Sequence, residues 1–172
     1  NKLGGSAHGI SGEGLTEFGL DVIKKMIELN MIIDIAHASP QIIDDILKTT
    51  DRPIISSHTG VKGTCDNVRN LSDKHLKAIA NSGGLVGIAM FEQAVCGTDA
   101  TATAKAIKYT SDLIGVDHVA LGSDFDGSVT TPFDITGLPL IVEELLKLDF
   151  SEKEIKMIMG ENVKLFLLNN LP

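Results

Sequence analysis

The chain has 172 residues, with 15 Lys and Arg against 23 Asp and Glu, and its formal net charge is −8. Hydrophobic residues make up 43% and charged residues 22%, which is typical of a globular domain and argues against a disordered chain. The acidic balance argues against a nucleic-acid-binding surface, and the lack of a long uncharged apolar run predicts no membrane-spanning segment.

The first third of the chain predicts a helix, a strand and a second helix. Thr16 is the expected N-cap of the first helix, whose apolar residues recur at helical spacing: Phe18, Val22, Met26 and Leu29. Residues 31–36 form a short apolar run that indicates a buried strand. Ser39 and Pro40 are a typical N-cap and first position of the next helix, with an expected buried face of Ile42, Ile43, Ile46 and Leu47.

The middle of the chain continues the alternation. Residues 53–57 predict a second strand, and residues 59–71 a polar loop. Ser72 is the expected N-cap of a helix that ends at Gly83 and Gly84 and buries Leu76, Ile79 and Ala80. Residues 85–90 predict a third strand.

The last third predicts one more strand among helices. The expected segments are a helix near 100–114, a strand over 118–122, a loop over 124–137 and a helix over 138–148. Ser151 and Glu154 form a capping-box pattern that opens another helix, and Gly160 is expected to break it before a segment over 162–168.

Four predicted strands separated by helices indicate an α/β fold with a parallel sheet. A doubly wound sheet and a (β/α) barrel both fit this pattern. A complete eight-stranded barrel takes about 250 residues, so a barrel chain of this length would be half of one, with about four βα units. We expect one domain over residues 1–172. The open sheet edges of a half-barrel would need a partner, either further chain or a second copy.

Two cysteines, Cys65 and Cys96, occur without a CxxC motif, which excludes a disulfide scaffold and a cysteine-rich zinc module. The favoured interpretation is that both cysteines are reduced thiols in a reducing compartment, and the alternative is a single disulfide. We therefore expect a cytoplasmic protein.

Polar side chains follow three of the predicted strands. His37, His58 and Asp124 each stand just after a strand, where functional groups of parallel α/β folds collect. Two histidines at neighbouring strand ends would lie about 4.8 Å apart, a suitable pair of ligands for one metal ion such as zinc. Asp124 would face them as a general acid or base, or as a further ligand. The alternative is ordinary polar residues at loop entrances.

Other candidates have weaker signals. His8, His75 and His118 are interpreted as outside the site, in a glycine-rich entry, on a surface helix and at the start of a strand respectively. Arg69 suits a planar carboxylate through paired hydrogen bonds, or it is a surface residue paired with Asp66 or Asp73. The sequence has no phosphate-binding glycine motif, no GxSxG elbow and no complete calcium loop.

Taken in order, several motifs resemble the membrane, or renal, dipeptidase family of zinc peptidases on a (β/α)8 barrel. They are GLTEFG at 14–19, IDIAHAS at 33–39, PIISSH at 53–58, RN at 69–70, GG at 83–84, GSDFDG at 122–127 and GEN at 160–162. The GSDFDG segment and the interval between His37 and His58 are the specific parts. The resemblance covers nearly the whole chain and places it in the C-terminal half of the barrel, as the fifth to eighth strands.

The resemblance implies roles for individual residues. His37 and His58 match two histidines that, with a bridging glutamate, hold one of two zinc ions. Arg69 matches the arginine that receives the terminal carboxylate of a dipeptide, and Asp124 matches the aspartate that handles protons; Asn70 and Asp126 match supporting positions. The expected activity is hydrolysis of dipeptides by a zinc-activated water.

One departure from the family pattern leaves alternatives open. The family's His-x-Asp pair, its bridging glutamate and a further substrate-binding histidine are not identifiable in this chain. The chain would then supply part of the site, with a missing N-terminal half-barrel or a second copy as partner. The alternatives are a truncated or split-barrel homologue without catalysis, and a related metal-dependent amidohydrolase that acts on another amide bearing a carboxylate.

Overall fold

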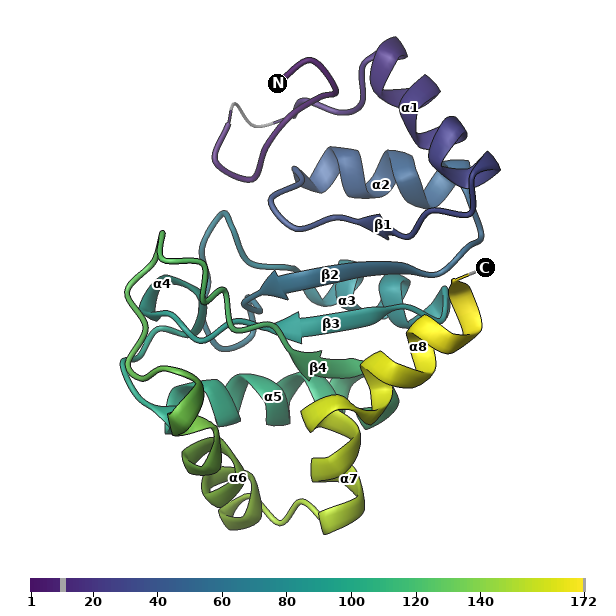
Figure 1. Ribbon diagram of the computed structural model, residues 1–172. Coiled ribbons are helices and arrows are strands. Elements are labelled where there is room, and N and C mark those ends of the chain that lie inside the picture. Colours follow the sequence, from purple (N-terminus) through teal and green to yellow (C-terminus); the bar gives the residue numbers. More distant parts are fainter. Residues whose placement is uncertain (10–11, 172) are drawn as a thin grey trace.

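The structure, a computed structural model, describes residues 1–9 and 12–171. Four parallel strands form one sheet in the order β1-β2-β3-β4, and their arrows point to the same side in Figure 1. The strands are β1 (Ile33–Asp34), β2 (Ile54–Thr59), β3 (Leu85–Ile88) and β4 (Val119–Leu121). The sheet pairs strands that are neighbours in sequence, so each connection is a βα crossover. The predicted parallel α/β fold is confirmed.

The helices before, between and after the strands follow the predicted caps where caps were predicted. They are α1 (Glu17–Glu28), α2 (Pro40–Thr49), α3 (Asp73–Asn81), α4 (Glu92–Val95), α5 (Ala100–Ile114) and α6 (Leu138–Lys147). Thr16, Ser39 and Ser72 each accept a backbone N–H at the helix start, as the sequence predicts. The helix α4 was not predicted. Short 3₁₀ turns precede β4 and α6, as η1 (Val116–His118) and η2 (Ile135–Gly137).

The C-terminal helices form one segment. They are α7 (Glu152–Lys156), a π-helical turn η3 (Met157–Glu161) and α8 (Asn162–Asn170). Of these, η3 and α8 pack near β4 and α7 packs against α6. Ser151 and Glu154 form the predicted capping box. Gly160 has non-helical dihedrals inside η3, which confirms the predicted break. Asn162 then donates to the carbonyls of Val116 and Val119, at 2.8 Å each, and ties α8 to β4.

The core lies between the sheet and its helices. Its largest fully buried side chains include Ile54, Val86 and Ile88 from the strands, and Ile43, Leu76, Ile79, Ile107, Ile141 and Leu145 from the helices. The predicted helix at α1 is confirmed, although its buried residues are Gly19 and Ile23 and Phe18 is 58% exposed. The predicted strand at 31–36 is shorter, although the Ile35 N–H still bonds to Ile55.

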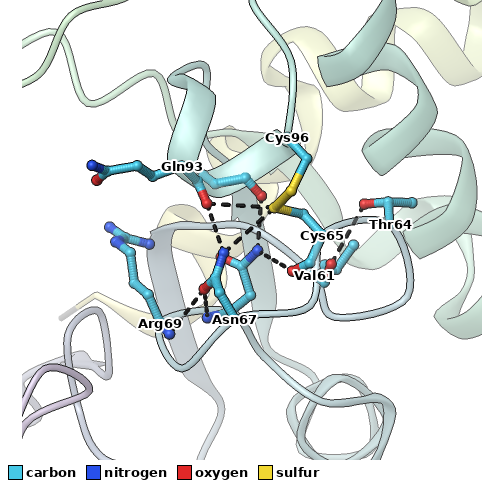
Figure 2. The surroundings of a disulfide bond; sticks show 9 residues. Val61, Thr64, Cys65, Asn67, Arg69, Gln93 and Cys96 are labelled. Atoms are coloured by element: carbon cyan, nitrogen blue, oxygen red, sulfur yellow. Dashed lines mark hydrogen bonds between the residues drawn. A yellow bond between two sulfur atoms is a disulfide. The ribbon is translucent and has the colours of Figure 1, made fainter.

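The two cysteines are joined. Cys65 and Cys96 form a disulfide with Cα atoms 5.4 Å apart, so the predicted pair of reduced thiols is wrong. The bond links the loop after β2 to the C-terminal end of α4 (Figure 2). Disulfides persist mainly in oxidising compartments, and the cytoplasmic location stays a prediction. Among the described residues, no helix is long and apolar enough to cross a bilayer.

Candidate active site

The structure brings His37 and His58 together at the carboxyl edge of the sheet. Their Nε2 atoms are 2.8 Å apart and their ring centroids 4.8 Å apart. The predicted spacing of neighbouring strands therefore does place the two imidazoles side by side. Asp124 lies on the same edge, with Oδ1 3.6 Å from Nε2 of His58. All three site residues from the strand ends thus face one point.

Irregular backbone aims these side chains. Between β2 and β3 the register shifts from Ser56–Val86 to Thr59–Ile88, so three steps along β2 match two along β3. This bulge contains His58, and bulges typically redirect a side chain next to a functional site. His37 and Asp124 have φ values of 63° and 64°, in the left-handed region that side chains rarely adopt. Such backbone strain concentrates at functional sites.

The ring of His58 is oriented by its neighbour. The Ser57 hydroxyl lies 3.0 Å from Nδ1 of His58, which leaves Nε2 directed at His37. A hydrogen bond at one ring nitrogen sets the tautomer and frees the other nitrogen to bind a metal. Ser57 is itself held by its backbone N–H, which donates to Asp34 at 3.0 Å. The sequence-based prediction missed Ser57, although its place beside His58 was the available signal.

The charge state of His37 also suits metal binding. Burial lowers the pKa of His37 below its ordinary value, and the positive charge of Arg69 lowers it further, with smaller effects from His58 and His8. Asp124 acts in the opposite direction. The net shift favours the neutral imidazole, which is the form that binds metal ions.

Arg69 is a buried cation without a partner. The residue is 8% exposed, and its two terminal guanidinium nitrogens have no hydrogen-bond partner among residues 1–9 and 12–171. Burial lowers the pKa of Arg69, and Asp124 partly opposes this effect. The guanidinium carbon lies 4.9 Å from the ring centre of Phe91, which offers a cation–π contact. Burying a charge without a partner is costly, so this geometry points to an external anion.

The alternative pairings predicted for Arg69 are wrong. Asp66 lies 3.7 Å from Lys62, and Asp73 accepts a hydrogen bond from the Tyr109 hydroxyl at 2.8 Å. Arg69 instead lines an open hollow of about 770 Å³ together with His8, Asp66, Asn67, Val68, Glu92, Gln93 and Cys96. The hollow is within the size range of small-molecule sites.

The other histidines divide into two groups. His75 is buried rather than on the surface, between Ser72 and Asp44, and His118 bonds the Gly84 carbonyl at the opposite end of the sheet. Both have structural partners, as expected of residues outside the site. His8, however, has its ring centroid 5.9 Å from that of His37. The prediction that His8 lies outside the site is therefore wrong as to its position, which is beside His37.

The chain has recognisable relatives. Residues 3–166 match the family described as membrane dipeptidase, Peptidase family M19. The chain belongs to this family. The family is one of metallopeptidases, so the resemblance seen in the sequence motifs is confirmed.

Individual relatives are about a third identical or less to this chain over the aligned region. An uncharacterized protein of Klebsiella pneumoniae is 32% identical, over 94% of this chain and 65% of its own length. Dipeptidase 3 of Mus musculus is 30% identical, over 87% of this chain and 32% of its own length.

Solved structures of the family have the same fold. A metallo peptidase of Rhodobacter sphaeroides, liganded with a phosphinate mimic of the dipeptide L-Ala-D-Ala, has a TM-score of 0.87 and 27% identity. It matches 96% of this chain and 49% of its own. An amidohydrolase of Pseudomonas aeruginosa has a TM-score of 0.86 and 26% identity, over 97% of this chain and 60% of its own. The chain thus spans about a third to two thirds of the length of these relatives.

Proposed function

We propose that this chain carries one half of the active site of a zinc-dependent dipeptidase. The observation that carries the proposal is the pair of converging imidazoles beside a buried arginine without a partner. In this proposal His37 and His58 hold one metal ion, Arg69 holds the free carboxylate of the dipeptide, and Asp124 moves protons.

The donor geometry fits a zinc ion. Two nitrogens on one tetrahedral zinc, each at about 2.0–2.1 Å, lie roughly 3.3 Å apart, against 2.8 Å between the Nε2 atoms of His37 and His58. A small rotation of either ring removes the difference. When bound, zinc supplies a water of lowered pKa and polarises the scissile carbonyl. The described residues contain no group of three or more side chains that could hold a metal, and the proposal takes the remaining ligands from a partner.

Asp124 is placed to transfer protons. Its carboxylate stands 3.6 Å from Nε2 of His58, beside the point where the two imidazoles converge. A carboxylate at that distance can accept a proton from the attacking water and pass it to the leaving amine. The left-handed backbone at Asp124 is the cost of directing the side chain there.

Arg69 gives the proposed preference for short peptides. Its guanidinium can form two parallel hydrogen bonds with a carboxylate, and burial strengthens such charge-assisted bonds. A peptide whose free carboxylate is fixed there presents its last peptide bond to the histidine pair. The related proposal, an amidohydrolase for another amide bearing a carboxylate, uses the same Arg69 contact and differs in the rest of the substrate.

The rest of the site requires a partner. β1 and β4 each pair with one neighbour in the sheet, and an unpaired parallel edge invites another strand. We propose that an N-terminal half-barrel, or a second copy of the chain, covers these edges and supplies the remaining metal ligands.

The test compares His58→Ala with a matched control, His118→Gln, at the other end of the sheet. The chain is incubated with Zn²⁺, bound metal is measured by mass spectrometry, and release of amino acids from Ala-Ala is followed. We expect zinc binding in the wild type and in His118→Gln but not in His58→Ala. Hydrolysis that is lost in His58→Ala would mean that this chain's residues suffice, with groups lent by a second copy, whereas zinc binding without hydrolysis would mean that the absent half carries indispensable ligands. Equal zinc binding by His58→Ala and the wild type would refute the metal assignment.

A further inference from the structure

We propose that Asn67 and the Cys65–Cys96 disulfide are positioning groups for Arg69, and that they set the strength of carboxylate recognition by tying its loop to α4. The inference rests on the proposed role of Arg69 as the carboxylate ligand. Asn67 touches neither metal nor substrate in this proposal, and acts through the backbone of Arg69.

The side chain of Asn67 forms both a local turn and a link to α4 (Figure 2). Its Oδ1 accepts the backbone N–H of Arg69 at 3.0 Å and that of Asn70 at 3.1 Å. Its Nδ2 donates to the carbonyl of Gln93 in α4 at 2.7 Å. One amide thus fixes the backbone at Arg69 relative to a second segment, 26 residues further along the chain.

Three more contacts close the same junction. The disulfide joins Cys65 in the loop to Cys96 at the end of α4. Nδ2 of Asn70 donates to the carbonyls of Cys65 and Ala94, at 2.7 and 2.8 Å. The loop also approaches α4 closely at Gly60, where a Cβ would lie 1.9 Å from the Ala94 carbonyl oxygen. These links fasten the loop to α4.

The same links support the side chain of Arg69. Its guanidinium stacks on Phe91, which is buried and directly precedes α4. The helix α4 has four residues and no side-chain cap at its N-terminus, so it has little stability of its own. Because the disulfide and the amide of Asn67 anchor α4, they hold both the backbone of Arg69 and the ring under its guanidinium.

Position matters because the guanidinium must meet two carboxylate oxygens at once. Misplacement of a binding group by about 1 Å can reduce activity by roughly a hundredfold. Asn67 and the Cys65–Cys96 disulfide together form what we call the clamp. Loss of the clamp should therefore weaken the binding of ligands with a free carboxylate and leave the binding of ligands without one unchanged. A purely structural role would weaken the binding of both.

The experiment measures the dissociation constants of Ala-Ala and of its C-terminal amide by calorimetry, on the full chain with Zn²⁺. Asn67→Ala removes both functions of the side chain, whereas Asn67→Asp keeps the acceptor oxygens and loses the donor to Gln93. The double variant Cys65→Ala with Cys96→Ala removes the disulfide. Asn170→Ala is the matched control, because its side-chain amide also bonds a backbone carbonyl, but on α8.

Reduction gives a test that needs no substitution. Cys65 is buried but Cys96 is exposed, so a dithiol reagent can reach the bond. The reagent passes two electrons and two protons to the sulfur pair, which becomes two thiols, and closes to its own disulfide. The reduced wild type should behave as the double cysteine variant.

We expect the acid to bind the wild type and Asn170→Ala more tightly than the amide. Asn67→Ala, the cysteine pair and the reduced protein should lose roughly tenfold to a hundredfold in affinity for the acid alone, with Asn67→Asp in between. An unchanged ratio of acid to amide affinity in these proteins would overturn the clamp. A wild type that fails to prefer the acid would overturn the role of Arg69, and with it both the proposed function and the clamp.

Discussion

The unpartnered cation at Arg69 leads to an unusual prediction, that Arg69→Met stabilises the fold. Two buried guanidinium nitrogens lack hydrogen-bond partners in the part of the chain that the structure describes. An unsatisfied buried donor costs about 1–3 kcal/mol, and the stacking on Phe91 returns roughly 1–2 kcal/mol. Met fills the space with an unbranched apolar side chain that adapts to its surroundings. We expect a net gain of about 2 kcal/mol in the free energy of unfolding.

The assay is equilibrium unfolding in urea, followed by circular dichroism, together with a thermal melt. For a chain of this size the gain corresponds to a rise in Tm of roughly 4–8 °C. Arg52→Met is the matched control, because Arg52 donates to the Ile27 carbonyl at 3.0 Å and to Asn30 at 2.7 Å. It should lose stability. If Arg69→Met also loses stability, the guanidinium has partners within the fold and the argument for an external anion is refuted.

Three further predictions concern stability. The hydrogen bond from Lys74 lowers the pKa of Asp44 below its ordinary value of 3.8. The ion pair therefore stabilises the folded state above pH 3.8, and this stabilisation is lost as the pH falls below that value. In an acid titration below pH 3.8, the wild type should lose stability more steeply than Asp44→Asn. Asn162→Ala removes two buried hydrogen bonds and should lower the free energy of unfolding by about 2–4 kcal/mol. Urea unfolding should show this as a lower midpoint. Gly122→Ala should yield little folded protein in expression and melting assays, because its Cβ would meet the Ser57 carbonyl oxygen at 2.2 Å.

The strands and helix starts were predictable because they depend on local chemistry, whereas the strand order was not, since the pattern fitted both a doubly wound sheet and a barrel. Thr16, Ser39 and Ser72 cap helices through hydrogen bonds that involve neighbouring residues only. The polar residues after the strands were predictable too, because parallel strands end at a common edge. The sequence alone therefore places His37, His58 and Asp124 at one edge of the sheet.

The features that were missed depend on contacts between distant segments. The helix α4 is only four residues long and is held by contacts with the loop after β2, to which no local pattern points. The sequence favours two reduced thiols over the disulfide because one cysteine pair carries no spacing signal. Helical spacing locates α1 but does not show which of its residues are buried, and Phe18, one of the four residues at that spacing, is exposed.

Features that lower the stability of this fold, namely strained backbone and a buried charge, gather at the candidate site. Left-handed backbone occurs at His37 and Asp124, and a buried charge occurs at Arg69. Left-handed positions at Asn30 and Asp149 directly follow helix C-caps, where such a residue ends a helix and requires no functional explanation. No equivalent explanation covers the strained residues at the site. Because these features bring an imidazole, a carboxylate and a guanidinium to the same edge of the sheet, their shared location supports the proposed binding site for a metal and a carboxylate.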